Sequence, residues 1–128
     1  MILALDTSTA TCRLWLVSPQ SRDEYEWEAG RGLADGLIRF LREKLSEHDV
    51  NWSDITGIAA YRGPGSFTGL RIGLTVLNTI ADDRHIPIVG ASEDGWLDAA
   101  LSRLEAGETD GLVMPLYGRA PNITKPRK

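Results

Sequence analysis

Residues 63 to 73, GPGSFTGLRIG, have the spacing in this chain that most suggests chemistry. They form a glycine-rich turn directly before an apolar run long enough to be a helix. Free N–H groups at a helix N-terminus bind phosphate, so a phosphate site is the first candidate. A Walker A loop needs Lys and Ser or Thr after its last glycine, whereas Leu70 and Arg71 follow Gly69. The dinucleotide fingerprint needs glycine three residues after Gly65, where Thr68 stands, so both phosphate motifs are excluded.

Single side chains offer no clearer chemistry. Ser66 lacks the G-x-S-x-G context of a nucleophile elbow, so we expect Ser66 or Thr68 to cap the helix that follows. His48 and His85 have no Cys, His, Asp or Glu at zinc-ligand spacing. Cys12 lies within an apolar run and is expected in the core. We therefore predict no catalytic residue, no metal site and no cofactor.

The composition is that of one globular domain. The chain has 128 residues, of which 42% are hydrophobic and 25% charged. A net charge of −4 argues against the body of the domain binding nucleic acid unaided. There is a single cysteine, and the sequence shows neither a basic leader nor an apolar run long enough for a membrane span. We expect a soluble cytoplasmic protein.

The apolar pattern predicts five strands and three helices. Strands are expected at 2–5, 12–17, 24–28, 55–61 and 86–89, and helices at 33–45, 67–83 and 92–104. The first three strands should be antiparallel, because only turns separate them. Ser92 is expected to cap the third helix. The residues 114–117 either add a short strand or pack down. The order β-β-β-α-β-α-β-α predicts an α/β domain with a mixed sheet.

The helix expected at 67–83 has apolar residues on two sides. One stripe is Phe67, Leu70, Leu74, Leu77 and Ala81, and the other is Ile72, Val76 and Ile80. Gly69 and Gly73 leave one side bare, so that another backbone can approach closely. A single sheet cannot cover both stripes. The second stripe therefore either docks on a partner or lies in the core beneath helix 33–45, whose Ile38 adds apolar surface outside its leucine stripe.

Two segments, MILALDTSTA and GPGSFTGLRIGL, resemble the TsaB (YeaZ) family, and the resemblance covers about residues 1–104. It implies a single actin-like (ASKHA, ribonuclease H-like) domain over residues 1–120, with residues 121–128 a disordered basic tail. MPLYGRAP is similar to the closing stretch of the family. Members usually carry a second, related half, for which 128 residues leave no room. Arg31, Leu33 and Ala34 stand where the family commonly has a histidine.

The resemblance implies a non-catalytic subunit that binds and supports TsaD in forming tRNA N6-threonylcarbamoyladenosine. TsaE is a further candidate partner, the chain alone should form a homodimer, and contact with tRNA should be indirect or weak. The tail with Arg119, Lys125, Arg127 and Lys128 is either a solvated end or a small tRNA contact. The first two helices would form the interface, through Leu33, Leu37, Phe67, Leu70, Ile72, Gly73, Leu74, Val76 and Leu77.

Actin-like ATPases place a phosphate-facing loop after the first strand, where this chain has Asp6, Thr7, Ser8 and Thr9. Ser8 replaces the usual glycine, so we expect a degenerate loop in which Asp6 binds backbone amides. The glycine-rich turn is expected to be structural, through Gly63, Pro64, Gly65, Ser66, Thr68 and Gly69. Two alternatives remain: a minimal actin-like nucleotide-binding enzyme or glycoprotease-type hydrolase, and a self-associating domain with a different partner.

Overall fold

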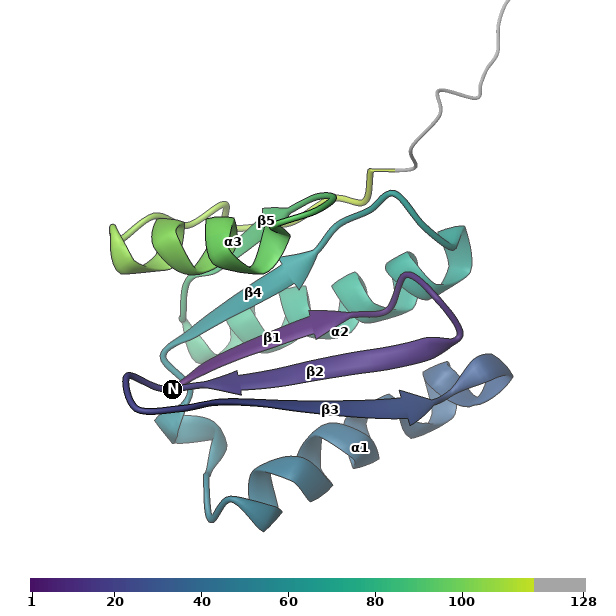
Figure 1. Cartoon of the computed structure of the whole chain (residues 1–128), viewed down its shortest axis with the longest axis horizontal. Helices are drawn as coiled ribbons and strands as arrows, with labels where there is room; N and C mark the ends of the chain where they lie inside the picture. The colour runs from purple at the N-terminus through teal and green to yellow at the C-terminus, as the bar shows by residue number, and fades with distance from the viewer. Residues whose placement is uncertain (117–128) are drawn as a thin grey trace, which may run out of the picture.

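The computed structural model describes residues 1–116, which form a five-stranded sheet with three α-helices (Figure 1). The strands are β1 (Ile2–Asp6), β2 (Thr11–Val17), β3 (Arg22–Glu28), β4 (Gly57–Tyr61) and β5 (Ile88–Ala91). The α-helices are α1 (Leu33–Glu47), α2 (Phe67–Arg84) and α3 (Trp96–Glu105), and short 3-10 helices η1 (Gly30–Gly32) and η2 (Trp52–Asp54) flank α1. The predicted tail and the domain end at residue 120 lie outside the described residues.

The sheet has the strand order β3-β2-β1-β4-β5. β1, β2 and β3 pair antiparallel, as predicted, and β4 pairs parallel to both β1 and β5. Helix α1 carries the chain from the β3 edge to β4, and α2 carries it from β4 to β5. The prediction of a mixed α/β sheet is confirmed.

Helices cover the two faces of the sheet unequally. α1 and α2 cover one whole face, where leucines from the strands and helices form the main core. α3 covers only part of the other face, in front of β4 and β5 in Figure 1. The small side chains Ala4, Ala59 and Ala100 meet there. On β3 the exposed glutamates alternate with half-buried Tyr25 and Trp27, which confirms a strand with one solvent-facing side.

Several predicted boundaries are wrong by two residues or more. β3 begins at Arg22 and β4 at Gly57, where residues 24 and 55 were predicted. β5 begins at Ile88 instead of residue 86, because His85 ends α2 in the left-handed conformation and the Ile86 N–H still bonds to the carbonyl of Ala81. α3 begins at Trp96 and Ser92 does not cap it. Glu93 and Gly95 have φ values of 64° and 77°, a left-handed conformation that no helix passes through, so the helix starts after them.

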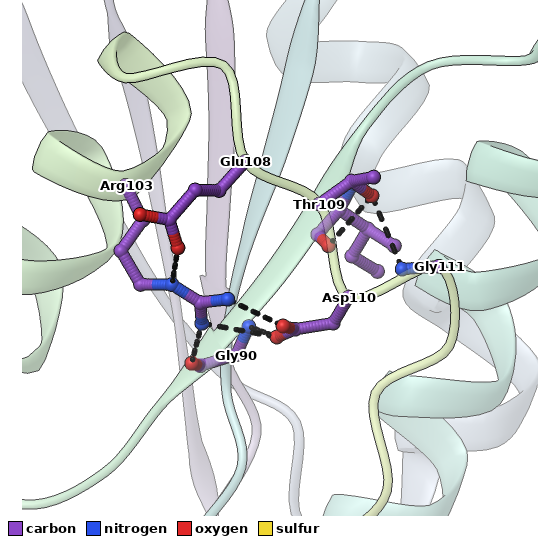
Figure 2. Close-up of polar contacts among 7 residues, drawn as sticks. Gly90, Arg103, Glu108, Thr109, Asp110 and Gly111 are labelled. Carbon is purple, nitrogen blue, oxygen red and sulfur yellow. Dashed lines mark hydrogen bonds and ion pairs between the residues drawn. The ribbon is translucent and has the colours of Figure 1, made fainter.

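The chain beyond α3 returns along the outer edge of β5, and we call its residues 108–116 the edge strap. Thr109 Oγ1 accepts a bond from the Ile88 N–H and donates to the Ile88 carbonyl, to which the Asp110 N–H also donates. The Asp110 carboxylate accepts from the Gly90 N–H at 2.8 Å (Figure 2). These bonds satisfy the edge groups that would otherwise attract another strand. The described part of 114–117 adds no strand: the carbonyl of Met114 and the N–H of Leu116 bond to Arg62, and both side chains are exposed.

Arg103 of α3 holds the edge strap in place. Its guanidinium bonds to both oxygens of Asp110, to Glu108 at 2.7 Å and to the Gly90 carbonyl at 3.2 Å (Figure 2). Hydrogen bonding to Arg103 lowers the pKa of the Asp110 carboxyl below its usual range. The folded state therefore favours the ionised carboxylate.

Asp110→Asn should lower the free energy of unfolding at neutral pH by about 1 kcal/mol, since the ion pair is partly exposed. The pKa of Asp110 is lower in the folded chain than in the unfolded chain, so the ionised carboxylate stabilises the fold. This stabilisation is complete above about pH 4 and disappears as the pH falls through the folded pKa. The free energies of unfolding of the wild type and the variant, measured in urea between pH 3 and 7, should therefore approach each other at the acid end. Glu105→Gln, an exposed position on α3, is the control and should change little. A pH-independent difference would contradict the assignment.

Candidate partner-binding face

The glycine-rich turn fastens the start of α2 to the turn after β1. Ser66 caps α2, because its Oγ accepts a bond from the Gly69 N–H at 3.2 Å, as predicted. The Ser66 N–H donates to the Ser8 carbonyl at 2.8 Å. Gly63 has a φ of 126°, a conformation that favours glycine. The turn therefore has the structural role that its residue types predicted.

Residues 6 to 9, the predicted degenerate phosphate loop, support α2. Asp6 Oδ1 accepts from the Ser8 N–H at 2.8 Å, which is the turn predicted for Asp6. Thr7 Oγ1 donates to the Gly69 carbonyl at 2.7 Å, and Thr7 and Ser8 are both buried. A Cβ on Gly69 would lie 2.2 Å from the Thr7 carbonyl oxygen, so glycine permits this contact. Only Thr9 is exposed, which favours a structural role for the loop.

The two apolar stripes of α2 have different environments. The stripe containing Leu70, Leu74 and Leu77 is buried against the sheet. The stripe containing Ile72, Val76 and Ile80 is half-buried along the side facing α1. α1 therefore covers one side of the second stripe, as the core interpretation predicts, and leaves the other side accessible. Docking of this stripe on a partner stays a prediction.

Most residues predicted to contact a partner are buried, and the prediction is corrected for them. They lie between the sheet and the two helices, so a partner cannot reach them: Leu33, Leu37, Leu70, Gly73, Leu74 and Leu77. Phe67, which is 53% exposed, and the half-buried Ile72 and Val76 remain accessible. The apolar periodicity identified the right helix, but it did not tell which stripe faces the sheet.

The accessible apolar side chains line a groove between α1 and α2, which we call the α1–α2 groove. Its accessible aliphatic residues on the two helices are Ala34, Ile38, Ile72, Val76 and Ile80, and Ala10 and the buried Leu33 also line its N-terminal end. Ala34 and Ile80 are additions to the predicted contact set, as is Ile38, whose place outside the leucine stripe was the signal that could have identified it. These side chains contain no acid, base or nucleophile. The aliphatic floor of the groove can therefore bind an apolar surface.

The histidine and cysteine candidates have structural surroundings. The Tyr25 hydroxyl hydrogen-bonds to His48 Nε2, and Asp23 lies 4.0 Å from His48 Nδ1, so His48 joins β3 to the end of α1. Burial raises the pKa of Cys12 to about 12, so the thiol stays protonated in the core.

The described part of the chain offers neither a metal-binding cluster nor a membrane-spanning helix. Residues 1–116 contain no cluster of three or more His, Cys, Asp or Glu side chains suited to a metal ion. Over the same range, no helix is both long enough and apolar enough to cross a membrane.

Comparison with known proteins identifies the family. Residues 27–107 match the family model described as "TsaD: tRNA N6-adenosine threonylcarbamoyltransferase". Two similar relatives are named tRNA threonylcarbamoyladenosine biosynthesis protein TsaB. The Escherichia coli protein is 31% identical over 91 residues, covering 71% of this chain and 39% of the relative. The Bacillus subtilis protein is 31% identical over 117 residues, covering 91% and 49%.

A solved structure agrees with these relatives. YeaZ from Pseudomonas aeruginosa superposes with a TM-score of 0.69 at 33% identity, covering 83% of this chain and 49% of that protein. The chain thus spans half or less of the length of each of these relatives. It belongs to the TsaB (YeaZ) family, within the wider family that the TsaD model describes.

Proposed function

We propose that this chain is a non-catalytic subunit that binds TsaD and supports it in making tRNA threonylcarbamoyladenosine. The α1–α2 groove carries this proposal, because it exposes Ile38 and half-exposes Ile72 and Val76 on one continuous face. Exposed apolar faces of this kind mark protein–protein contacts. The names of the relatives place them in the same biosynthesis.

The proposal includes the assembly around this face. TsaD would supply the transfer chemistry, TsaE is a further candidate member, and contact with tRNA would be indirect, in the cytoplasm. Without TsaD, the same groove would bind a second copy of the chain, since one apolar face can serve both contacts. The structural turn formed by residues 6 to 9 is consistent with an accessory role.

The test is complex formation with TsaD of the same organism, read by light scattering and calorimetry. The wild-type chain should form a one-to-one complex, and Val76→Arg should weaken it at least about 100-fold by placing a charge in the apolar contact. Gln20→Arg, in the exposed β2–β3 turn, is the control for an added charge and should bind normally. Val76 is only half-buried, so its arginine can reach water and the fold should persist.

Two results would contradict the proposal. Absence of a complex at micromolar concentrations would remove TsaD as the partner. Formation of threonylcarbamoyladenosine by this chain without TsaD would show an enzyme instead of an accessory subunit.

A further inference from the structure

The arginines of this protein divide into two groups by location. Those on the sheet edge and α3 side are bonded: Arg13 to Glu26, Arg22 to Asp98, Arg103 to Glu108 and Asp110, and Arg62 to the Met114 carbonyl. Those on the α1–α2 layer form no ion pair with any carboxylate in residues 1–116: Arg31, Arg39, Arg42, Arg71 and Arg84. Within residues 1–116, the guanidiniums without a carboxylate partner thus all belong to the layer that contains the groove. The Arg71 guanidinium also lies 5.3 Å from the centre of the Phe67 ring.

Four of the five unpaired arginines lie at the ends of the α1–α2 groove. Arg31 lines a hollow of about 340 Å³ at the N-terminal ends of the helices, and Arg71 lines the adjoining hollow of about 330 Å³. Arg42 and Arg84 line a hollow of about 240 Å³ at the opposite end. The helices run side by side in the same direction (Figure 1). The aliphatic floor therefore has a pair of arginines at each end.

Carboxylates of the chain itself do not balance these arginines. The two hollows at the N-terminal end are lined by no carboxylate among the described residues. Asp83 lines the hollow at the other end, as the single acid beside Arg42 and Arg84. Asp35, Glu43 and Asp82 are exposed on the same helices outside these hollows. Asp49, just after α1, lines a separate hollow together with Arg42. Counted by their lining residues, the hollows at both ends of the groove are net positive.

Covering the groove has an electrostatic requirement. In the free chain, water solvates the unpaired guanidiniums. A partner that excludes this water must supply carboxylates, because a desolvated charge without a counter-charge costs several kcal/mol. At about 2 Å per residue through η1 and 1.5 Å through α1, Arg31 and Arg42 are roughly 17 Å apart along these helices, and Arg71 and Arg84 of α2 are roughly 20 Å apart. These spans correspond to about 11 to 13 residues of a helix lying in the groove.

We propose that the α1–α2 groove receives a helix of the partner protein with an apolar stripe flanked at both ends by Asp or Glu, about three turns apart. This inference rests on the proposed function and specifies the surface that TsaD must present. The arginines make the contact selective, since carboxylates at matching positions bind and like charges are rejected.

Two other occupants fit this geometry less well. The α2 helix of a second copy carries Arg71 and Arg84 at the two ends of its own stripe, so it would bring guanidiniums to guanidiniums in either direction. A homodimer through this groove should therefore be weaker than the complex with TsaD. An RNA strand would find phosphate contacts at both ends. Trp52, in the hollow beside Arg42, is the single aromatic residue among those that line the three hollows. One ring at one end is a poor platform for stacking successive bases.

The experiment is charge reversal, with affinity for TsaD measured by calorimetry at about 50 and 500 mM salt. The double variant Arg42→Glu/Arg71→Glu should weaken binding at least about 30-fold at low salt and abolish most of the salt dependence. Arg39→Glu is the matched control, since Arg39 is exposed, unpaired and on α1, but lines none of the hollows. It should change affinity by less than about twofold. Circular dichroism should show all variants folded.

The outcomes separate this inference from the proposed function. If Val76→Arg prevents the complex while the double reversal binds like wild type or like Arg39→Glu, the charge inference is overturned and the subunit role stands. Without a wild-type complex, both fail. If the double reversal reduces tRNA binding or dissolves a homodimer while TsaD affinity is unchanged, the groove belongs to RNA or to a second copy, and the inference is again overturned.

Discussion

Gly73→Ala should destabilise the protein by about 2 kcal/mol or more, although glycine-to-alanine changes in a helix usually stabilise it by about 0.5 to 1 kcal/mol. A Cβ at Gly73 would lie 2.1 Å from Thr7 Oγ1 and 2.8 Å from its Cγ2. Thr7 is buried between β1 and α2, so neither element can move without breaking the Thr7–Gly69 bond. The overlap therefore outweighs helix propensity.

A double-mutant cycle tests this mechanism. Thr7→Ala removes the two overlapping atoms, so Gly73→Ala in that background should cost at least about 1 kcal/mol less than in wild type. Gly69→Ala overlaps the Thr7 backbone oxygen at 2.2 Å, and Thr7→Ala should not rescue it. Gly32→Ala meets no atom within 4 Å and should be nearly neutral. Additive effects of Thr7→Ala and Gly73→Ala in urea unfolding would disprove the contact.

Leu74→Arg should unfold or nearly unfold the chain, with a loss of about 4 kcal/mol or more. Leu74 is 4% exposed and packs with the core leucines between α2 and the sheet. An arginine there would bury an unpaired charge and also overfill the core. A domain of this size has only about 5 to 15 kcal/mol of stability. If Leu74 were a partner contact, as the resemblance implied, the same variant would leave the fold intact.

Thr75→Arg is the neighbouring control for Leu74→Arg. Thr75 is exposed, so the same side chain one residue along should change stability by less than about 1 kcal/mol. Circular dichroism melts of the two variants should therefore differ widely. If Leu74→Arg melts like wild type, the buried orientation of this α2 stripe is incorrect.

Local chemistry accounts for what the sequence by itself determined. Apolar runs and alternation specify which segments are strands and helices, because their period follows from backbone geometry. Ser66 as a cap and Asp6 as a turn residue were predictable, because each binds a backbone N–H within three residues. The GPGSFTGLRIGL segment identified the family, which the comparisons confirm.

Only the tertiary structure decided which surface is left accessible. Two apolar stripes on α2 have equal periodicity, and packing on the sheet buries the one with Leu74 and leaves the one with Val76 half-exposed. The edge strap and the Arg103–Asp110 pair depend on bonds to β5 that link residues 13 to 21 positions apart. The sorting of arginines into paired and unpaired groups depends equally on distant contacts, such as Arg22 with Asp98. Such contacts form only when separate elements pack together, so no local pattern contains them.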